Sequence, residues 1–216
     1  VMRMLECFLG EDVFQNGIAI YMERHAYGNT EGTDLWNALQ EAAVAANVPE
    51  IGTKARTVTA IMNEWVFTPG FPLITVSDST VPGGVIVLRQ QPFKLLPEQA
   101  VAEQTWKIPL TLRAQLNDGS TRQWKLLLDQ KEYTVHVGDG FAHVQVNVEG
   151  NSFVHVQYAP RLAAALTGAL AVLPVIERYN LLSDTWACVR AGKIPATEFL
   201  SIVTKFTTET DPNVWA

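Results

Sequence analysis

The spacing of apolar residues divides the chain into a helical part, a strand-rich part and a second helical part. Up to about residue 70, apolar side chains recur every three or four positions, which is the period of an amphipathic helix. Between residues 73 and 158 the period is two, as in strands with one buried face. The helical period returns after Pro160. The pattern therefore predicts a multidomain α+β chain with regions 1–72, 73–159 and 160–216.

Each helix predicted in the first region has an apolar face and a start or stop signal. Gly10 is expected to end the first helix, and the acidic pair Glu11–Asp12 suits the positive N-terminal end of the second. Thr33 and Thr57 are expected to cap the third and fourth, because a hydroxyl accepts hydrogen bonds from free N–H groups there. The residues expected on the buried faces are Met4, Leu5, Phe8, Leu9, Phe14, Ile18, Tyr21, Met22, His25, Trp36, Leu39, Ala43, Val58, Ile61, Met62 and Trp65.

The middle region consists of short runs of aliphatic, β-branched and aromatic residues separated by turn-prone pieces such as NDGS and EGNS. This spacing predicts an antiparallel β-sandwich. The stretch LNDGST indicates a hairpin with a type I′ turn, because Asp-Gly tolerates positive φ. Pro109 has no N–H, so we expect an edge strand or a bulge at that point. The runs are 73–76, 84–93, 106–116, 122–129, 133–137, 142–149 and 153–158.

The last region predicts helices over 161–173, 179–192 and 195–210. Pro174 and Gly192 are expected to end the first two, and Pro195 suits the first turn of the third. The residues expected to face inward are Leu181, Leu182, Trp186, Val189, Phe199, Ile202, Val203 and Phe206.

Composition is typical of a folded chain, with 48% apolar and 18% charged residues. The net charge is −6 and no Lys/Arg cluster occurs, so neither nucleic acid nor a membrane is an expected partner. The longest apolar stretch, at residues 162–176, is shorter than the roughly 20 residues of a membrane span. Cys7 and Cys188 are expected to be free, buried thiols rather than a disulfide. These features favour a cytoplasmic protein.

No catalytic motif is recognisable in these 216 residues. The sequence contains no His-Glu-x-x-His, Cys-x-x-Cys, glycine-rich phosphate loop or Gly-x-Ser-x-Gly. The histidines His25, His136, His143 and His155 are expected at the rim of the core or in solvent, because no carboxylate joins them at ligand spacing. The acidic residues Glu11, Asp12, Glu31, Asp34 and Asp184 are interpreted as helix starts. The six tryptophans, Trp36, Trp65, Trp106, Trp124, Trp186 and Trp215, are interpreted as core residues.

Six stretches occur in an order that identifies an enzyme family. They are RMLECFLGEDVFQNGIAIYMERHAYGNTEGTDLWNAL, IMNEWVFTPGFPLITV, VLRQQPF, WKIPLTL, SFVHVQYAP and ERYNLLSDTWACVRAGKIPATEFLSIV. Together they resemble zinc aminopeptidases of the aminopeptidase N and puromycin-sensitive type, which are gluzincin metallopeptidases. The resemblance covers nearly the whole chain. It implies that 1–72 is the C-terminal helical part of a thermolysin-like catalytic domain, 73–159 a β-sandwich, and 160–216 the first helices of a superhelical hairpin domain.

The resemblance also implies that the catalytic residues lie outside this chain. In that family the zinc is held by His-Glu-x-x-His and a downstream Glu, while a Gly-x-Met-Glu-Asn segment and a Tyr bind the peptide and the tetrahedral intermediate. All of these precede the segment that matches Val1. We therefore assign no catalytic, substrate-binding or metal-binding residue here. We expect zinc, peptide substrates and the remaining segments of the enzyme to belong to the parent protein, and the chain alone to be inactive.

Two other functions fit the sequence. One is a stand-alone β-sandwich that binds another polypeptide, and the other is a carbohydrate-binding sandwich with tryptophans grouped on one solvent-facing surface. Both ends of the chain lie within apolar helical patterns, which favours a fragment of a larger enzyme. A fragment should also expose apolar side chains on the helices at 1–27 and 160–210, because such patches are uncommon on complete monomers.

Overall fold

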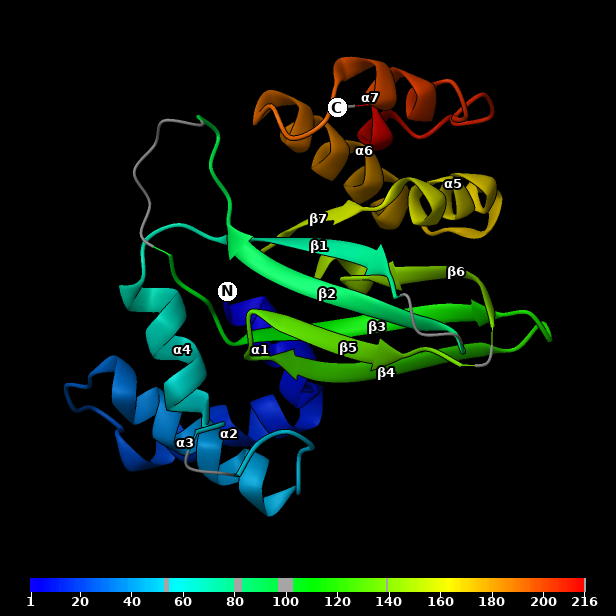
Figure 1. Ribbon diagram of the computed structural model, residues 1–216. Helices are drawn as coiled ribbons and strands as arrows, with labels where there is room; N and C mark the ends of the chain where they lie inside the picture. Colours follow the sequence, from blue (N-terminus) through cyan, green and yellow to red (C-terminus); the bar gives the residue numbers. More distant parts are fainter. Residues whose placement is uncertain (53–54, 80–82, 97–102, 139, 216) are drawn as a thin grey trace.

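The computed structural model describes the chain except residues 53–54, 80–82, 97–102, 139 and 216. The order of elements is helices, strands and helices, as the apolar period predicted (Figure 1). The helices are α1 (Met2–Leu9), α2 (Glu11–Arg24), α3 (Gly32–Ala45), α4 (Val58–Phe67), α5 (Pro160–Gly168), α6 (Val175–Arg190) and α7 (Ala196–Val203). The strands are β1 (Pro72–Asp78), β2 (Val85–Pro92), β3 (Ile108–Leu116), β4 (Thr121–Leu128), β5 (Glu132–His136), β6 (Phe141–Val146) and β7 (His155–Tyr158). Short 3₁₀ turns are η1 (Val148–Gly150), η2 (Leu170–Val172) and η3 (Pro212–Val214).

The described strands form two small sheets, with the orders β5-β2-β1-β7 and β4-β3-β6. Helices α1–α4 lie at one end of the strands, α5 and α6 lie beside β7, and α7 packs on α6 (Figure 1). The expectation of a wholly antiparallel unit is wrong at one pair, because β7 runs parallel to β1 from Leu73↔His155 to Val76↔Tyr158. The chain leaves β6 in one sheet and enters β7 in the other through η1. No hairpin therefore sets the direction of β7.

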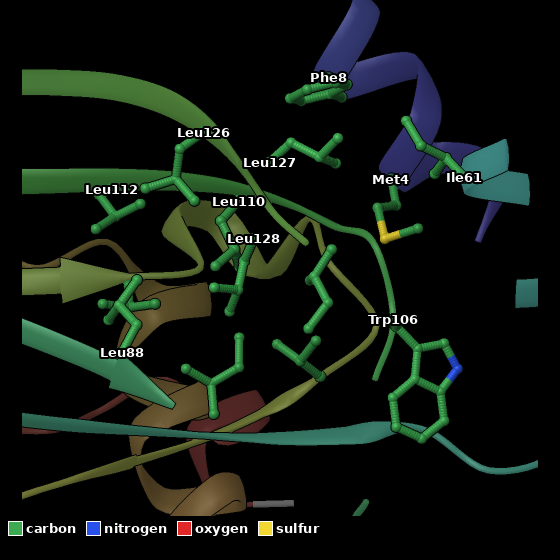
Figure 2. Packing of buried hydrophobic residues seen from close by; sticks show 14 of the residues in the cluster. Met4, Phe8, Ile61, Leu88, Trp106, Leu110, Leu112, Leu126, Leu127 and Leu128 are labelled. Carbon is green, nitrogen blue, oxygen red and sulfur yellow. The ribbon is translucent and has the colours of Figure 1, made fainter. Parts of the chain in front are cut away.

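One hydrophobic cluster joins both sheets to the first helices (Figure 2). Leu88 from β2 and Leu112 from β3 are fully buried in it, together with Met4 and Ile61 from α1 and α4. The alternation of buried positions along the strands directs one face of each sheet into this cluster. A second cluster lies within the C-terminal helices and contains Leu166, Leu173, Leu181, Leu182, Ile202, Phe206 and Val214.

The buried faces predicted for α1, α3 and α4 are confirmed, whereas the face predicted for α2 is only partly buried and is wrong at Met22. Within α2, Gly17 alone is buried, and Met22 is 61% exposed. A Cβ on Gly17 would come within 2.9 Å of the Leu39 Cα. Helices α2 and α3 therefore pack by close backbone approach at a glycine, not through large side chains on α2.

One of the two predicted threonine caps is confirmed. The Thr57 hydroxyl accepts from the Ala60 N–H at 3.0 Å. Thr33 is not a cap, because α3 begins at Gly32 and Glu31 occupies the N-cap position. The Asp34 carboxylate accepts the Glu31 N–H at 2.9 Å, so these two acidic residues form a capping box around the helix start.

The β3–β4 hairpin is confirmed, but its turn is not type I′. The Gly119 N–H donates to the Leu116 carbonyl at 3.1 Å, which makes Asn117 and Asp118 the central residues of the turn. Gly119 has φ of +88°, whereas neither central residue has positive φ. The loop is a type I turn followed by a left-handed glycine, which is the usual three-residue hairpin connection.

Pro109 does not mark an edge strand, because β3 is the central strand of its sheet. At Pro109 the strand pairs with β4 alone, since pairing with β6 begins three residues later at Leu112. The proline thus occupies a stretch of β3 where one side has no strand partner, and the missing N–H removes no hydrogen bond from the ladder.

The C-terminal helices depart from prediction in several places: α6 begins at Val175 and not at residue 179, and α7 ends at Val203 and not at residue 210. The helix predicted over 161–173 is α5 up to Gly168, followed by the separate 3₁₀ turn η2. Trp186, expected to face inward, is 46% exposed and lies beside the Phe199 ring at 5.1 Å. Leu181 and Leu182 are buried as expected.

Candidate functional site

The four histidines lie on separate segments, one directly after α2 and the others on β5, β6 and β7. His25 follows α2 and stacks near Tyr21, with ring centroids 5.4 Å apart, while His136 is exposed on β5. Burial lowers the pKa of His143, and the charge of Arg113 lowers it further. Within the described parts of the chain, no three His, Cys, Asp or Glu side chains gather into a group that could hold a metal.

His155 pairs with Asp184 between β7 and α6. Its Nδ1 lies 2.7 Å from the Asp184 Oδ1, and the Val156 N–H donates to the Asp184 Oδ2 at 3.1 Å. The rings of Phe71 and Phe93 flank the imidazole at 5.3 and 4.8 Å. Burial raises the pKa of Asp184, and the hydrogen bond from His155 opposes that shift. The geometry makes this pair a connection between a strand and a helix.

The interpretation of Asp184 as a helix start is therefore wrong. Asp184 lies in the middle of α6 and uses its carboxylate to bind the backbone and side chain of β7. Local sequence shows only the helix that carries the carboxylate. The strand that it binds is 28 residues earlier in the chain, so a local pattern cannot reveal the contact.

Glu177 makes a second buried connection from α6. Its side chain is fully buried and forms an ion pair with Arg113 of β3, which also donates to the Gln145 Oε1 at 2.8 Å. The Glu149 N–H donates to Glu177 at 3.2 Å. Removing Arg113 would leave the Glu177 carboxylate buried without its charged partner, which is costly. Glu177 and Asp184 are seven residues apart, so both occupy the face of α6 that meets the strands.

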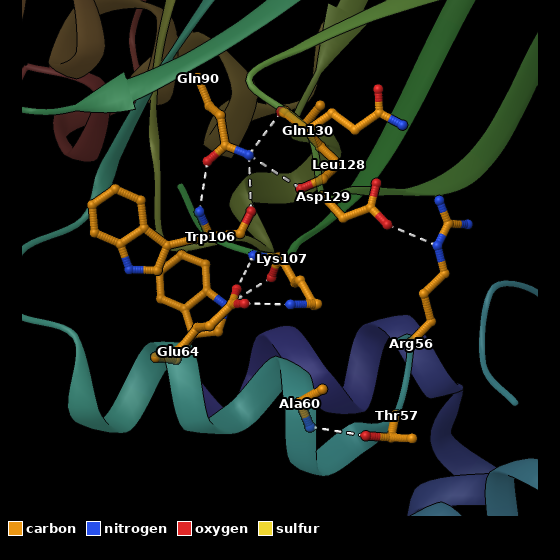
Figure 3. Close-up of polar contacts among 11 residues, drawn as sticks. Arg56, Thr57, Ala60, Glu64, Gln90, Trp106, Lys107, Leu128, Asp129 and Gln130 are labelled. Carbon is orange, nitrogen blue, oxygen red and sulfur yellow. Dashed lines mark hydrogen bonds and ion pairs between the residues drawn. The ribbon is translucent and has the colours of Figure 1, made fainter. Parts of the chain in front are cut away.

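Gln90 connects the two sheets (Figure 3). The residue is 1% exposed, and its Nε2 donates to the carbonyls of Trp106 at 2.9 Å and Gln130 at 3.0 Å. Its Oε1 accepts the Trp106 N–H at 2.8 Å. The amide thereby satisfies backbone groups at the start of β3 and the end of β4, which would otherwise be buried without partners.

Two ionic contacts hold α4 and the loop before it to the strands (Figure 3). Glu64 accepts the Lys107 N–H and pairs with the Lys107 ammonium. Arg56 donates to the Asp129 Oδ2 at 2.8 Å, and this hydrogen bond raises the pKa of Arg56. The first helices, the strands and α6 are thus linked by polar contacts as well as by the shared core.

Two surface hollows are also present. One, of about 370 Å³, is lined by Lys94, Lys131 and Lys193 with Glu103 at its margin. The other, of about 250 Å³, lies on the C-terminal helices and is lined by Tyr179, Leu182, Ser183, Trp186, Phe199, Val214 and Trp215. The first is polar with an excess of positive charge, and the second is largely apolar.

The tryptophans divide into two groups. Trp36, Trp65 and Trp106 are at most 9% exposed, as the core interpretation predicted, and Trp124 is half-buried. Trp186 and Trp215 are 46% and 50% exposed, so that interpretation is wrong for them. This exposed pair lies on the C-terminal helices and lines the apolar groove. The sheets therefore carry no group of solvent-facing tryptophans within their described residues, as a carbohydrate platform would need.

Both thiols are free, as predicted, although Cys7 is half-buried and only Cys188 is buried. Burial raises the pKa of Cys188 to about 12. None of the helices that the structure describes has the length and apolar character needed to cross a membrane.

Two protein-family models match separate parts of this chain. Residues 1–65, which hold α1–α3 and most of α4, match the Peptidase family M1 domain. Residues 143–216, from β6 to the C-terminal helices, match the ERAP1-like C-terminal domain. The chain is related to the aminopeptidases of peptidase family M1. This M1 relationship confirms the resemblance read from the sequence.

Individual curated proteins are similar along nearly the whole chain. Human aminopeptidase N is 33% identical over 209 residues, which are 91% of this chain and 20% of that protein. Leucyl aminopeptidase of Saccharolobus solfataricus is 28% identical over 98% of this chain and 24% of its own length. Tricorn protease-interacting factor F2 of Thermoplasma acidophilum is 27% identical over 98% of this chain and 24% of its own length. The chain spans only 20–24% of the length of these relatives.

Sequence reasoning missed the three buried polar residues that connect the parts of this M1-related chain. Gln90 continues the two-residue alternation of Ile86 and Leu88, so its position on the buried face was readable. Glu177 and Asp184 were readable as one helix face from their seven-residue spacing. The residues that Glu177 and Asp184 contact could not be predicted, because each lies at least 28 residues away in sequence.

Proposed function

We propose that this chain is a segment of a zinc aminopeptidase. In this proposal, residues 1–72 are the C-terminal helical part of its catalytic domain, 73–159 a β-sandwich, and 160–216 the start of its C-terminal helical domain. The observation that carries it is the order of the two family matches, an M1 peptidase domain at 1–65 and an ERAP1-like C-terminal domain at 143–216. The meeting of side chains from both sheets in one core supports the sandwich.

The role proposed for the segment is structural. Glu64 and Arg56 tie the first helices to the strands, and Glu177 and Asp184 tie the last helices to them. The contact of Glu177 in particular requires one geometry, because its carboxylate is fully buried and displacing Arg113 would leave that charge without compensation. The segment would therefore hold the catalytic and C-terminal parts of the enzyme in fixed positions.

The residues of this chain do not fit a zinc site. His155 Nδ1 is bound to Asp184, and His143 lies beside the positive charge of Arg113. The 216-residue sequence contains no His-Glu-x-x-His. We therefore derive no catalytic step from these residues. In this proposal, the zinc ligands, the general base, the transition-state tyrosine and the peptide-binding groups come from other parts of the enzyme.

The first test measures the activity of the isolated chain. Purified chain is mixed with leucine and alanine 4-nitroanilides, with and without added zinc. We expect no zinc-dependent release of nitroaniline. Release that is abolished by a chelator and restored by zinc would show that the chain carries its own catalytic site.

A second test uses the complete protein that contains this segment. Zinc-dependent release of N-terminal residues is expected there, and its absence from folded, zinc-loaded protein would contradict the proposed function. Inactivity of the isolated chain and activity of the complete protein are separate results, so each part of the proposal can fail by itself.

The proposed partners are other segments of the same enzyme. The apolar groove at Trp186 and Trp215 exposes side chains that a further part of the protein would cover. The same groove would serve a stand-alone interaction module, whose occupant would be a different protein. In the complete enzyme the groove should be protected from solvent, which hydrogen exchange along α6 and α7 can measure. The cytoplasmic location stays a prediction.

A further inference from the structure

The polar hollow brings together three lysines from separate parts of the chain. Lys94 follows β2, Lys131 lies between β4 and β5, and Lys193 follows α6. All three line one cavity of about 370 Å³. The chain as a whole has a net charge of −6, so this concentration of positive charge is a local feature.

The positive charges in the hollow are poorly compensated. Glu103 is the one carboxylate in the described lining; its side chain is 92% exposed and lies 3.4 Å from the Lys131 ammonium. Lys94 and Lys193 are half-buried, and no carboxylate among the described residues pairs with either ammonium. Like charges held around one cavity repel each other, and a bound anion would remove that repulsion.

The backbone at each lysine is fixed by hydrogen bonds. The Lys131 carbonyl accepts the Gln90 N–H at 3.0 Å, and the residue before Lys94 donates to the Phe71 carbonyl at 2.9 Å. After α6, Gly192 takes φ of +65°, and the Lys193 N–H donates to the Cys188 carbonyl at 2.9 Å. This arrangement is a Schellman motif, which sets the direction in which the chain leaves the helix. The lysines are thus placed by the fold and not by free loops.

We propose that this hollow binds a small phosphate-bearing anion. The charged residues that line it are three lysines and one glutamate, and a lysine ammonium binds phosphate as a point charge. Thr105 and Gln91 are polar residues of the same lining. A cavity of this volume lies within the roughly 300–1,000 Å³ range of small-molecule sites. The ligand would contact both the strands and the C-terminal helices, and the site does not depend on the proposed peptidase function.

Calorimetric titration with inorganic pyrophosphate tests this site. We expect binding that weakens as salt rises, and an affinity at least about tenfold lower in the triple variant K94Q/K131Q/K193Q, since each tenfold is about 1.4 kcal/mol. The matched control is Lys205→Gln, which removes an exposed lysine outside the hollow and should leave binding unchanged. Absence of binding at millimolar pyrophosphate would overturn the proposal, as would equal losses in the triple variant and the control.

Two further measurements make the assignment specific. Succinate at equal ionic strength carries two carboxylates, and equal affinity for succinate would overturn the assignment to phosphate chemistry.

The triple variant should melt at the same or a higher temperature than the parent chain at low salt without anion, because the repulsion between the lysine ammonium groups is relieved. A lower melting temperature would contradict the uncompensated charge. If the triple variant does not fold, Lys94→Gln and Lys193→Gln separately supply the same comparison.

Discussion

Gln90 shows how one buried amide stabilises several backbone groups. It lies on the face of β2 that enters the core, where a leucine would ordinarily sit, and all of its amide atoms are used. The groups that it satisfies belong to segments that enter and leave strands of the other sheet. Because these groups are buried, the cost of losing the amide exceeds the net gain of the same number of exposed hydrogen bonds.

Gln90→Ala is expected to lower the free energy of unfolding by roughly 2–3 kcal/mol, because it leaves the Trp106 N–H and neighbouring carbonyls without partners. Urea unfolding followed by tryptophan fluorescence measures the change. Gln91→Ala is the matched control, since its side chain is exposed, and should change stability by less than about 0.5 kcal/mol. Equal effects of the two variants would show that the Gln90 network adds no stability.

At the scale of elements, an ion pair between Arg178 and Glu209 joins α6 to the segment that follows α7. Arg178 donates to both carboxylate oxygens of Glu209, and its Nη1 donates to the Leu173 carbonyl at 2.6 Å. Glu209 also accepts the N–H groups of Thr210 and Asp211 at 3.0 and 2.9 Å. The hydrogen bond from Arg178 is the main reason that the pKa of Glu209 falls to about 2.

This pKa predicts acid sensitivity of the C-terminal segment. The folded state keeps Glu209 ionised down to about pH 2, whereas an unfolded glutamate protonates near its ordinary pKa of about 4.3. The stabilisation is therefore complete above that ordinary value and is lost as pH falls toward 2. Glu209→Gln should be less stable than the parent chain at pH 6, and the difference should shrink between pH 5 and pH 2.

Unfolding curves recorded from pH 6 to pH 2 measure this difference. Glu23→Gln is the control, because Glu23 is an exposed glutamate on α2. A stability difference for Glu209→Gln that stays constant with pH would contradict the linkage.

At the scale of the whole molecule, both helical ends carry exposed apolar side chains. Those on or beside the last helices include Val172, Ile176, Tyr179, Trp186, Leu200 and Trp215. Those on or beside the first helices include Met2, Met22, Tyr27, Val66 and Phe67. The expectation that both helical ends expose apolar side chains is met, and on the C-terminal helices several of these side chains form a groove.

Trp186→Gln should reduce both the binding of an apolar fluorescent dye and any concentration-dependent association of the isolated chain. Its indole is part of a continuous apolar wall, so its loss interrupts the groove. Dye titration and sedimentation velocity measure the two effects. Met22→Gln removes a more exposed apolar residue that lies outside the groove and should have a smaller effect. If Met22→Gln reduced dye binding and association more than Trp186→Gln, the surface responsible would lie on the first helices and not in the groove.

Local signals in the sequence predicted the elements well but not their partners. The periods of two and 3.6 placed the strands and helices, and the Asp-Gly pair placed the β3–β4 hairpin. The caps and turn type were predicted less well, because Thr33 competes with the neighbouring Glu31–Asp34 pair and Gly119 alone takes positive φ. The hollow lined by lysines was the least predictable feature, because Lys94, Lys131 and Lys193 come from three distant segments of the chain.

The sequence by itself determined which segments are helices or strands, because backbone geometry and apolar period are properties of a few neighbouring residues. It also carried the family relationship, which depends on the order of short stretches such as WKIPLTL along the chain. Only the tertiary structure decided that β7 runs parallel to β1, that Asp184 binds β7, and that Lys94, Lys131 and Lys193 share one hollow. Those facts depend on contacts between residues far apart in the chain, which folding creates and local spacing does not record.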